Sequence, residues 1–286
     1  MRIIRADKIK NLVSELCILA NLNLRKDVLT KLKSSYSKEK NKRANQILFA
    51  IIQNAKIARE EGIAICQDTG MPVVFVGIGQ EVFVSGDLKA AIMRGVGSGY
   101  KKGFLRGSVA KNPLKRGKPG YLPCVIHIDI VKGNKIKLTV LPKGFGCENK
   151  SALKMFKPTA GISEIKKFIV DTVKSAGPDA CPPYIVGVGI GGTADYAGLL
   201  AKKALLRKLQ APSSLPVRQA GKLQANYKLE YDLLREINKL NIGPMGLGGK
   251  TTALAVNIET YPTHISGLPV AVNISCHALR SATGIL

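Results

Sequence analysis

The sequence predicts an α+β protein with an irregular mixed α/β arrangement, in which a helical N-terminal part precedes a mixed sheet with packed helices. In the first sixty residues, apolar side chains recur at spacings of three and four, as on one face of a helix. Further along, β-branched runs and helical segments are mixed without a strict βαβ rhythm. We therefore divide the chain into residues 1–62, a helical part, and residues 63–286, a mixed α/β part of the same domain.

The N-terminal part is predicted to be helical because its apolar residues recur with the period of a helix. This period is clearest over residues 44–55, and Gly62 offers a C-terminal stop. Cys17 lies in the helical apolar segment LVSELCILA. We expect it to be a small core residue, because a free cysteine packs like a small apolar side chain.

Strand signals begin after residue 70. Residues 71–79 and 81–86 read as a strand pair, and Asp87 can cap the helix that follows. Residues 124–144 read as a hairpin that turns at Gly133–Asn134, a strong turn signal. Alternation with isoleucines in its first strand places His127 on the outer face, so we do not expect His127 to be a ligand.

In the C-terminal half, segments with the apolar spacing of a helix alternate with segments typical of a strand. Helices are expected at residues 162–175, 194–206 and 229–240, and strands at residues 184–190, 251–259 and 268–275. The segment Lys-Leu-Gln-Ala at 208–211 recurs at 222–225, with a stretch rich in Pro and Ser between the copies. We interpret residues 209–224 as an inserted surface loop, since loops tolerate such growth.

The composition limits the function. The chain has 286 residues, 45% of them hydrophobic, which is enough for a sizeable core, and its formal net charge is +25. Such charge fits a nucleic-acid binder, but the basic residues are spread along the chain and aromatic rings for base stacking are scarce. No apolar run reaches the length of a membrane span, and the N-terminus lacks the apolar block of a secretion signal. We therefore expect a cytoplasmic protein without nucleic-acid or membrane partners.

Two glycine-rich segments imitate nucleotide-binding motifs. Residues 187–192 satisfy G-x-G-x-x-G, but the acidic residue expected about twenty positions later is missing. Residues 243–251 resemble a phosphate-binding loop, but Pro244 stands where that motif needs its first glycine and has no N–H to offer. We assign neither segment to a nucleotide.

Six cysteines are present, without any C-x-x-C pair, which argues against zinc ribbons and thioredoxin-like sites. Cys124 opens a strand-like run and reads as structural. Cys66, Cys181 and Cys276 lie instead beside residues that break regular structure, in CQDTG, CPPY and ISCHA. Their spacing alone leaves two interpretations open, three buried thiols or three ligands, and it favours the first.

Three long motifs resemble the α subunit of class I fumarate hydratase, the iron–sulfur, two-subunit form. They are ICQDTGMPVVFV, ACPPYIVGVGIGGT and the segment from IGPMGLGGKTTALAVNIETYPTHI to ISCHA. The resemblance is collinear from about residue 29 to residue 282. Tartrate dehydratases of the same family share CQDTG and ACPP, but GGKTTALAVNIE is closer to the fumarases.

The resemblance implies a [4Fe-4S] cluster held by Cys66, Cys181 and Cys276. Three thiolates leave one iron open, and an open iron can act as a Lewis acid on the hydroxyl and a carboxylate of malate. Cys147, in GFGCENKS, stands where the family has another small residue, and we do not count it as a ligand.

The resemblance also implies the substrate contacts. Asp68 matches the family's acid, and Gln67 matches an amide that contacts substrate. Arg106 matches an arginine that binds a substrate carboxylate, for which its planar fork is suited. From the residues alone, Arg106 reads as a solvated surface arginine. Gly146 matches a glycine whose backbone approaches the substrate.

The expected activity is the interconversion of fumarate and (S)-malate, a small dicarboxylate pair. The family's base lies in the β part, so we expect a separate β subunit and an αβ heteromer, alone or dimerised. The alternatives are a dehydratase of tartrate or another hydroxy-dicarboxylate and, more distantly, a basic nucleic-acid-binding protein.

Overall fold

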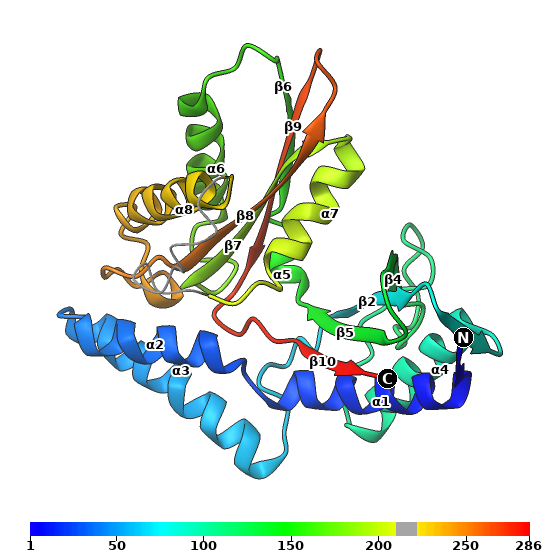
Figure 1. Ribbon diagram of the computed structural model, residues 1–286. Helices are drawn as coiled ribbons and strands as arrows, with labels where there is room; N and C mark the ends of the chain where they lie inside the picture. The colour runs from blue at the N-terminus through cyan, green and yellow to red at the C-terminus, as the bar shows by residue number, and fades with distance from the viewer. Residues whose placement is uncertain (210–221) are drawn as a thin grey trace. The chain divides into compact units, whose positions relative to one another are not determined.

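A computed structural model describes residues 1–209 and 222–286, which form two compact units (Figure 1). Unit 1 contains Met1–Arg25, Asn54–Phe145 and Arg280–Leu286, and unit 2 contains Lys26–Gln53 and Gly146–Leu279. This division differs from the predicted boundary at residue 62. Most of the predicted insertion, residues 209–224, lies outside the described residues.

The mixture of helices and sheets confirms the predicted fold class. The elements assigned to unit 1 are β1 (Arg2–Arg5), α1 (Ala6–Leu22), β2 (Met71–Gly79), β3 (Val82–Ser85), α4 (Leu88–Lys102), β4 (Val125–Val131), β5 (Ile136–Lys143) and β10 (Ala282–Ile285). Those of unit 2 are α2 (Lys26–Lys38), β6 (Ala152–Phe156), α6 (Ile162–Ala176), β7 (Tyr184–Gly192), α7 (Ala194–Ala204), α8 (Lys222–Asn238), η1 (Pro244–Gly246), β8 (Ala253–Thr263) and β9 (Leu268–Ser275). Two helices, α3 (Lys42–Glu61) and α5 (Phe145–Glu148), cross the unit boundaries.

Unit 1 contains a four-stranded mixed sheet in the order β10-β5-β2-β4. Strand β2 runs parallel to β4 and antiparallel to β5. Helices α1 and α4 pack closely because α4 presents glycines to α1. A Cβ on Gly99 would lie 2.5 Å from the Ser14 carbonyl oxygen, and one on Gly95 would lie 2.6 Å from that of Lys10. The core between sheet and helices includes Cys17 and Cys124, which confirms both as buried residues.

The predicted strand pairings of unit 1 are wrong. Strand β3 pairs with β1, a strand in the N-terminal part that was expected to be helical. Strand β2 lies between β4 and β5, the two strands of the predicted hairpin. The run in β2 is largely buried, so it takes the centre of the sheet, with partners on both edges. Strand β4 is an edge strand, so Ile130, which was expected to face the core, is 78% exposed. His127 stacks on Phe75 with ring centroids 5.1 Å apart.

Unit 2 contains a four-stranded sheet in the order β6-β9-β7-β8, with α7 on one face and α6 and α8 on the other (Figure 1). Two glycines of the G-x-G-x-x-G segment lie inside β7 and let α7 approach. A Cβ on Gly187 would lie 2.1 Å from the Ala201 oxygen, and one on Gly189 would lie 2.0 Å from that of Ala197. Helix–sheet packing explains these glycines without a nucleotide.

Most locally determined elements match their predictions. Three helices fill the N-terminal part, and Gly62 follows α3 with a φ of +66°. Asp87 caps α4 by accepting a hydrogen bond from the Ala90 N–H at 2.8 Å. The predicted helices correspond to α6, α7 and α8, and the later predicted strands to β7, β8 and β9.

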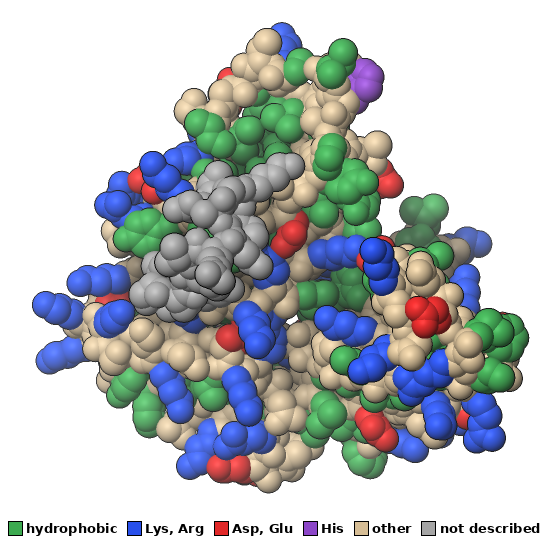
Figure 2. Space-filling model, viewed as in Figure 1, with side chains coloured by type: hydrophobic (Ala, Val, Ile, Leu, Met, Phe, Trp, Pro, Cys, Tyr) green, Lys and Arg blue, Asp and Glu red, His purple; other side chains and the backbone are tan. Residues whose placement is uncertain are grey.

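Basic side chains dominate the charged residues of the surface (Figure 2). Lysine and arginine are scattered over the visible face and do not follow a single stripe. Among the described residues, no helix is both long enough and apolar enough to cross a membrane.

Candidate functional site

The residues singled out by the sequence fall into two groups, one in each unit. Unit 1 holds Cys66, Gln67, Asp68 and Arg106. Unit 2 holds Gly146, Cys181 and Cys276. The first group lies around residues 66–70, which we call the Asp68 loop, and the second around residues 177–183, which we call the Cys181 loop.

The Asp68 loop connects α3 to β2 and is anchored against β5. Gly70 has a φ of +74°, and a Cβ there would lie 2.7 Å from the Lys143 backbone nitrogen. Only glycine fits this close approach without moving backbone. Tyr100, buried in α4, donates its hydroxyl to the Thr69 carbonyl oxygen at 2.8 Å. Burial raises the pKa of this tyrosine, which keeps the hydroxyl protonated as a donor.

The Asp68 carboxylate is oriented by two backbone donors. Its Oδ1 accepts from the Gly70 N–H at 3.0 Å, and its Oδ2 accepts from the Phe145 N–H at 2.9 Å. Hydrogen bonds to a charged acceptor are short and directional, so the carboxyl group is held in one orientation. Asp68 is half-buried, which leaves part of it open to a reactant.

Gln67, which precedes Asp68 in the chain, and Arg106 have exposed side chains. The Gln67 Oε1 lies 3.4 Å from Cys66 Sγ, which donates to it. Thr69 Oγ1 donates to the Arg106 carbonyl oxygen at 3.1 Å. The fold therefore brings Arg106 to the Asp68 loop, although 38 positions separate it from Asp68 in the sequence. Its exposure alone would have matched a solvated surface arginine.

The Cys181 loop has an unusual backbone at the cysteine itself. Cys181 has a φ of +56°, a conformation that costs a non-glycine residue about 1–3 kcal/mol and is concentrated at functional sites. Its carbonyl oxygen accepts from the His277 N–H at 3.3 Å. Because His277 directly follows Cys276, this bond brings the segments of the two cysteines together.

Cys147 and Gly146 lie next to the Cys181 loop. Cys147 is buried and its Sγ donates to the Ala180 carbonyl oxygen at 3.4 Å. Gly146 is exposed, and a Cβ there would lie 3.9 Å from the Asp179 oxygen. Cys147 thus packs beneath the loop, whereas Gly146 leaves its own backbone accessible beside it.

The glycine-rich segment at 243–251 also supports the Cys181 loop. Met245 N–H donates to the Pro182 carbonyl oxygen at 2.8 Å. The N–H groups of Gly246 and Leu247 donate to carbonyl oxygens within the same segment, and that of Gly248 donates to the Ile242 carbonyl oxygen just before it. These four donors are occupied by the protein itself and are not offered to a phosphate.

A polar cluster that the sequence did not indicate connects α5 to β9. Asn273 Nδ2 donates to Glu148 Oε2 at 3.0 Å and to Ser151 Oγ at 2.9 Å, and Lys202 pairs with Glu148. We call these four residues the Glu148 network. It ties α5, the short helix that carries Gly146, to the strand that leads into Cys276. Asn273 shows only strand alternation in the sequence, so no local signal marks it.

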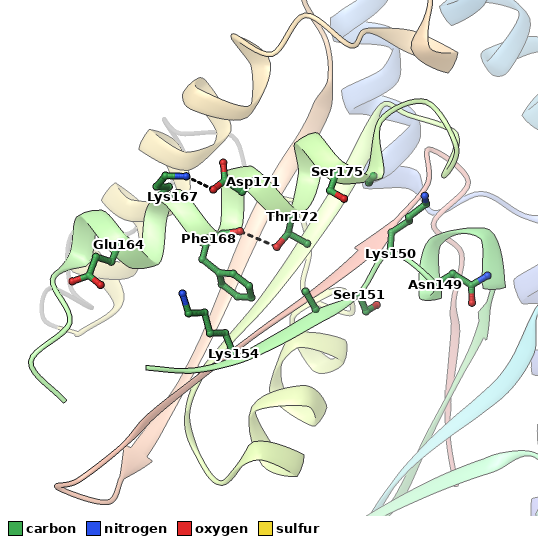
Figure 3. Close-up of a pocket in the computed structure, with 12 residues that line it drawn as sticks. Asn149, Lys150, Ser151, Lys154, Glu164, Lys167, Phe168, Asp171, Thr172 and Ser175 are labelled. Carbon is green, nitrogen blue, oxygen red and sulfur yellow. Dashed lines mark hydrogen bonds and ion pairs between the residues drawn. The ribbon is translucent and has the colours of Figure 1, made fainter. Parts of the chain in front are cut away.

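A groove of about 690 Å³ between β6 and α6 contains none of the predicted residues (Figure 3). Figure 3 shows Lys167 paired with Asp171, and Thr172 bonded to the Phe168 carbonyl oxygen. Charges of both signs line the groove, and the Lys167 ammonium already has an acidic partner. We therefore assign no ligand to it.

The comparison with known proteins identifies the family. The family model described as fumarate hydratase (Fumerase) matches residues 10–285. The chain belongs to the fumarate hydratase (Fumerase) family. This membership confirms the resemblance of the motifs and makes the protein a hydro-lyase, an enzyme type that adds or removes water.

Curated relatives of this Fumerase-family chain carry a different substrate in their names. A Methanocaldococcus jannaschii protein named "Putative L(+)-tartrate dehydratase subunit alpha" is 44% identical over 285 residues, 96% of each chain. The L(+)-tartrate dehydratase α subunits of Escherichia coli K12 and O157:H7 are each 28% identical over 281 residues, covering 97% of this chain and 90% of theirs.

The cysteines of this hydro-lyase differ in a way that suits an iron–sulfur cofactor. Cys17, Cys124 and Cys147 are buried, whereas Cys66, Cys181 and Cys276 are partly exposed and lie outside helices and strands. Thiolate sulfur is the preferred ligand of iron–sulfur clusters. The donor types therefore suit a cluster, but within the described ranges no three Cys, His, Asp or Glu side chains converge into a metal-binding group.

Proposed function

We propose that the chain is the α subunit of an iron–sulfur hydro-lyase that interconverts fumarate and (S)-malate. In this proposal Cys66, Cys181 and Cys276 hold a [4Fe-4S] cluster. One observation carries the proposal: three partly exposed cysteines lie in family motifs, and the backbone-oriented carboxylate of Asp68 lies two residues from one of them.

When bound by three cysteines, such a cluster offers one open iron as a Lewis acid toward the hydroxyl and a carboxylate of malate. The other roles belong to the chain. Asp68 gives a proton to the departing hydroxyl in dehydration and takes it from water in hydration. Its two backbone donors fix the direction of this transfer, so no reorientation is needed at the moment of reaction.

The remaining predicted residues bind the substrate. Arg106 can hold a carboxylate with two parallel N–H groups, and the Gln67 amide can donate to another substrate oxygen. Gly146 leaves room for the substrate to approach its backbone, which a Cβ would obstruct. These contacts determine where the reacting bond lies relative to Asp68.

We infer that a separate β subunit supplies the base and the remaining carboxylate contacts. The relatives' names designate them as α subunits, which supports a partner chain. We also infer a reducing, cytoplasmic location, because the proposed cluster needs its three cysteines as thiolates.

The test is anaerobic co-expression with the β chain, followed by iron and sulfide analysis and fumarate hydration. Single Cys→Ser changes at positions 66, 181 and 276 should each reduce the bound iron and abolish hydration. Cys124→Ala, in a buried cysteine of unit 1, should retain both. Unchanged iron content in all three Ser variants would refute the proposed ligand set.

L(+)-tartrate dehydration is the second candidate, and the names of the relatives favour it. The segment GGKTTALAVNIE favours fumarate instead. A substrate panel on the αβ complex distinguishes them by kcat/KM. A value for L(+)-tartrate tenfold above that for (S)-malate would reject fumarate hydration while leaving the hydro-lyase assignment intact.

A further inference from the structure

Arg280, near the C-terminus, extends a fully buried side chain toward the Asp68 loop. It is 3% exposed, and its Nη2 donates to the Asp68 carbonyl oxygen. We propose that Arg280 is a positioning residue that holds Asp68 in the orientation required for proton transfer. This inference rests on the role proposed above for Asp68 and concerns how that role is achieved.

Two side chains from outside the loop hold its carbonyl groups. Arg280 donates to the Asp68 carbonyl oxygen. The Tyr100 hydroxyl lies 2.8 Å from the Thr69 carbonyl oxygen and 3.3 Å from the Gly70 carbonyl oxygen. The amide N–H of Gly70 holds one oxygen of the Asp68 carboxylate. Arg280 therefore fixes the backbone from which the catalytic side chain projects, while backbone amides fix the side chain itself.

Ion pairing does not account for the arginine. Among the described residues, no carboxylate lies within ion-pair distance of Arg280, and its Nε has no hydrogen-bond partner. Burying a guanidinium without a counter-charge is unfavourable, and an apolar side chain of similar volume is often the more stable choice. The bond to Asp68 is the contact that an apolar side chain could not reproduce.

Small displacements at this point should affect turnover more than binding. A misplacement of 1 Å between a catalytic group and its substrate can lower the rate by about 10²-fold. Arg280 is buried and holds a backbone oxygen, so its removal should leave the exposed Arg106 and Gln67 free to bind substrate. The expected signature is a reduced kcat with a nearly unchanged KM.

The first experiment measures the loop without using activity. Hydrogen exchange by mass spectrometry on the αβ complex should show weaker protection in Arg280→Met for peptides containing the amides of Gly70 and Phe145. The protection in Arg280→Lys should lie between those of the wild type and Arg280→Met, since a lysine offers a point charge in place of a planar fork. Arg94→Met, at an exposed arginine of α4, is the matched control and should leave this protection unchanged.

The second experiment measures coupling to Asp68 by kinetics. Arg280→Met should lower kcat for (S)-malate about 10²-fold with KM within threefold, while bound iron stays at the wild-type level. In an Asp68→Asn background, the same change should cost less than threefold, because a positioning residue has nothing left to position. Arg94→Met should behave as wild type.

The outcomes separate this inference from the proposed function. Unchanged exchange and unchanged kcat in Arg280→Met would overturn the positioning role while hydro-lyase activity stands. Additive losses in the double variant would also overturn it. Weaker protection at Gly70 and Phe145, in a complex that hydrates neither fumarate nor its analogues, would support the contact and refute the proposed function instead.

Discussion

The cysteines differ at the residue scale in a way that chemistry can reveal. Burial raises the pKa of Cys124 to about 11 and also raises that of Cys17. Both therefore remain protonated thiols at pH 8, and the thiolate is the reactive form. Cys66, Cys181 and Cys276 are partly exposed.

We therefore predict selective alkylation of the cluster-free protein. Iodoacetamide at pH 8 should label Cys66, Cys181 and Cys276 at least ten times faster than Cys17 and Cys124, as measured by peptide mass spectrometry. In urea the difference should disappear. Labelling of Cys17 at the rate of Cys181 in the folded protein would contradict the burial described above.

The same shift has a consequence for stability at alkaline pH. The pKa of Cys124 in the folded protein lies above its ordinary value of 9.0. The protonated thiol therefore contributes fully to the free energy of unfolding below pH 9, and this contribution is lost as the pH rises through about 11. Part of the alkaline fall in the unfolding temperature should therefore be absent in Cys124→Ala.

The sequence could single out candidate site residues, but it could not predict the contacts that surround them. The motif CQDTG marks Cys66, Gln67 and Asp68, and the resemblance added Arg106. The contacts that orient Asp68 come from Phe145 and Arg280, which lie 77 and 212 positions away. No local pattern encodes such contacts, because they depend on how distant strands meet.

The packing of α7 on β7 is the clearest test at the element scale. Gly189 faces the Ala197 carbonyl oxygen so closely that an added Cβ would lie 2.0 Å from it. A backbone atom cannot yield as a flexible side chain can. Gly189→Ala should therefore lower the free energy of unfolding by about 3 kcal/mol or more, the upper part of the range for overpacking.

Gly198, within α7 itself, provides the matched control. Apart from its chain neighbours and the backbone of its own helix, a Cβ built there has no atom within 4 Å. Gly198→Ala should raise the free energy of unfolding by about 1 kcal/mol, because alanine favours the helix interior. Urea denaturation followed by circular dichroism measures both variants. Equal effects of the two substitutions would contradict the packing argument.

The Glu148 network gives a second prediction at this scale. Asn273 is buried and supplies donors to Glu148 and Ser151. Asn273→Ala would leave both acceptors without that partner, which should cost about 1–3 kcal/mol of unfolding free energy. Asn238→Ala, at another asparagine of unit 2 that bonds backbone groups, gives a comparison for the loss of an amide in general. An unchanged midpoint in Asn273→Ala would show that the network is not stabilising.

Elements and their pairing differ in how far they could be predicted. Asp87 marks the start of α4, and apolar periodicity marks α6, because these signals act within a few residues. The turn signal at Gly133–Asn134 was misleading, since β2 takes the place between the two flanking strands. Which strands pair depends on how the whole sheet is buried, and a short segment of sequence carries no information about that.

Charge acts at the scale of the whole molecule. The chain carries 44 basic and 19 acidic residues, and the basic side chains are distributed over the visible face (Figure 2). Such a surface has a positive potential, which raises the local concentration of small anions and is weakened by salt. Scattered basic residues and few aromatic rings favour this role over nucleic-acid recognition.

We therefore expect the activity of the αβ complex on dicarboxylates to depend on ionic strength. Raising potassium chloride from about 20 to 300 mM shortens the screening length from roughly 20 to 6 Å, so kcat/KM for (S)-malate should fall several-fold while kcat changes little. The fall should be steeper for a dianion than for a monoanionic analogue, because steering scales with substrate charge. Sucrose at matched viscosity controls for diffusion. A salt-independent kcat/KM would mean that the excess positive charge serves another purpose, and the partner chain would be the first place to look, through the salt dependence of αβ association.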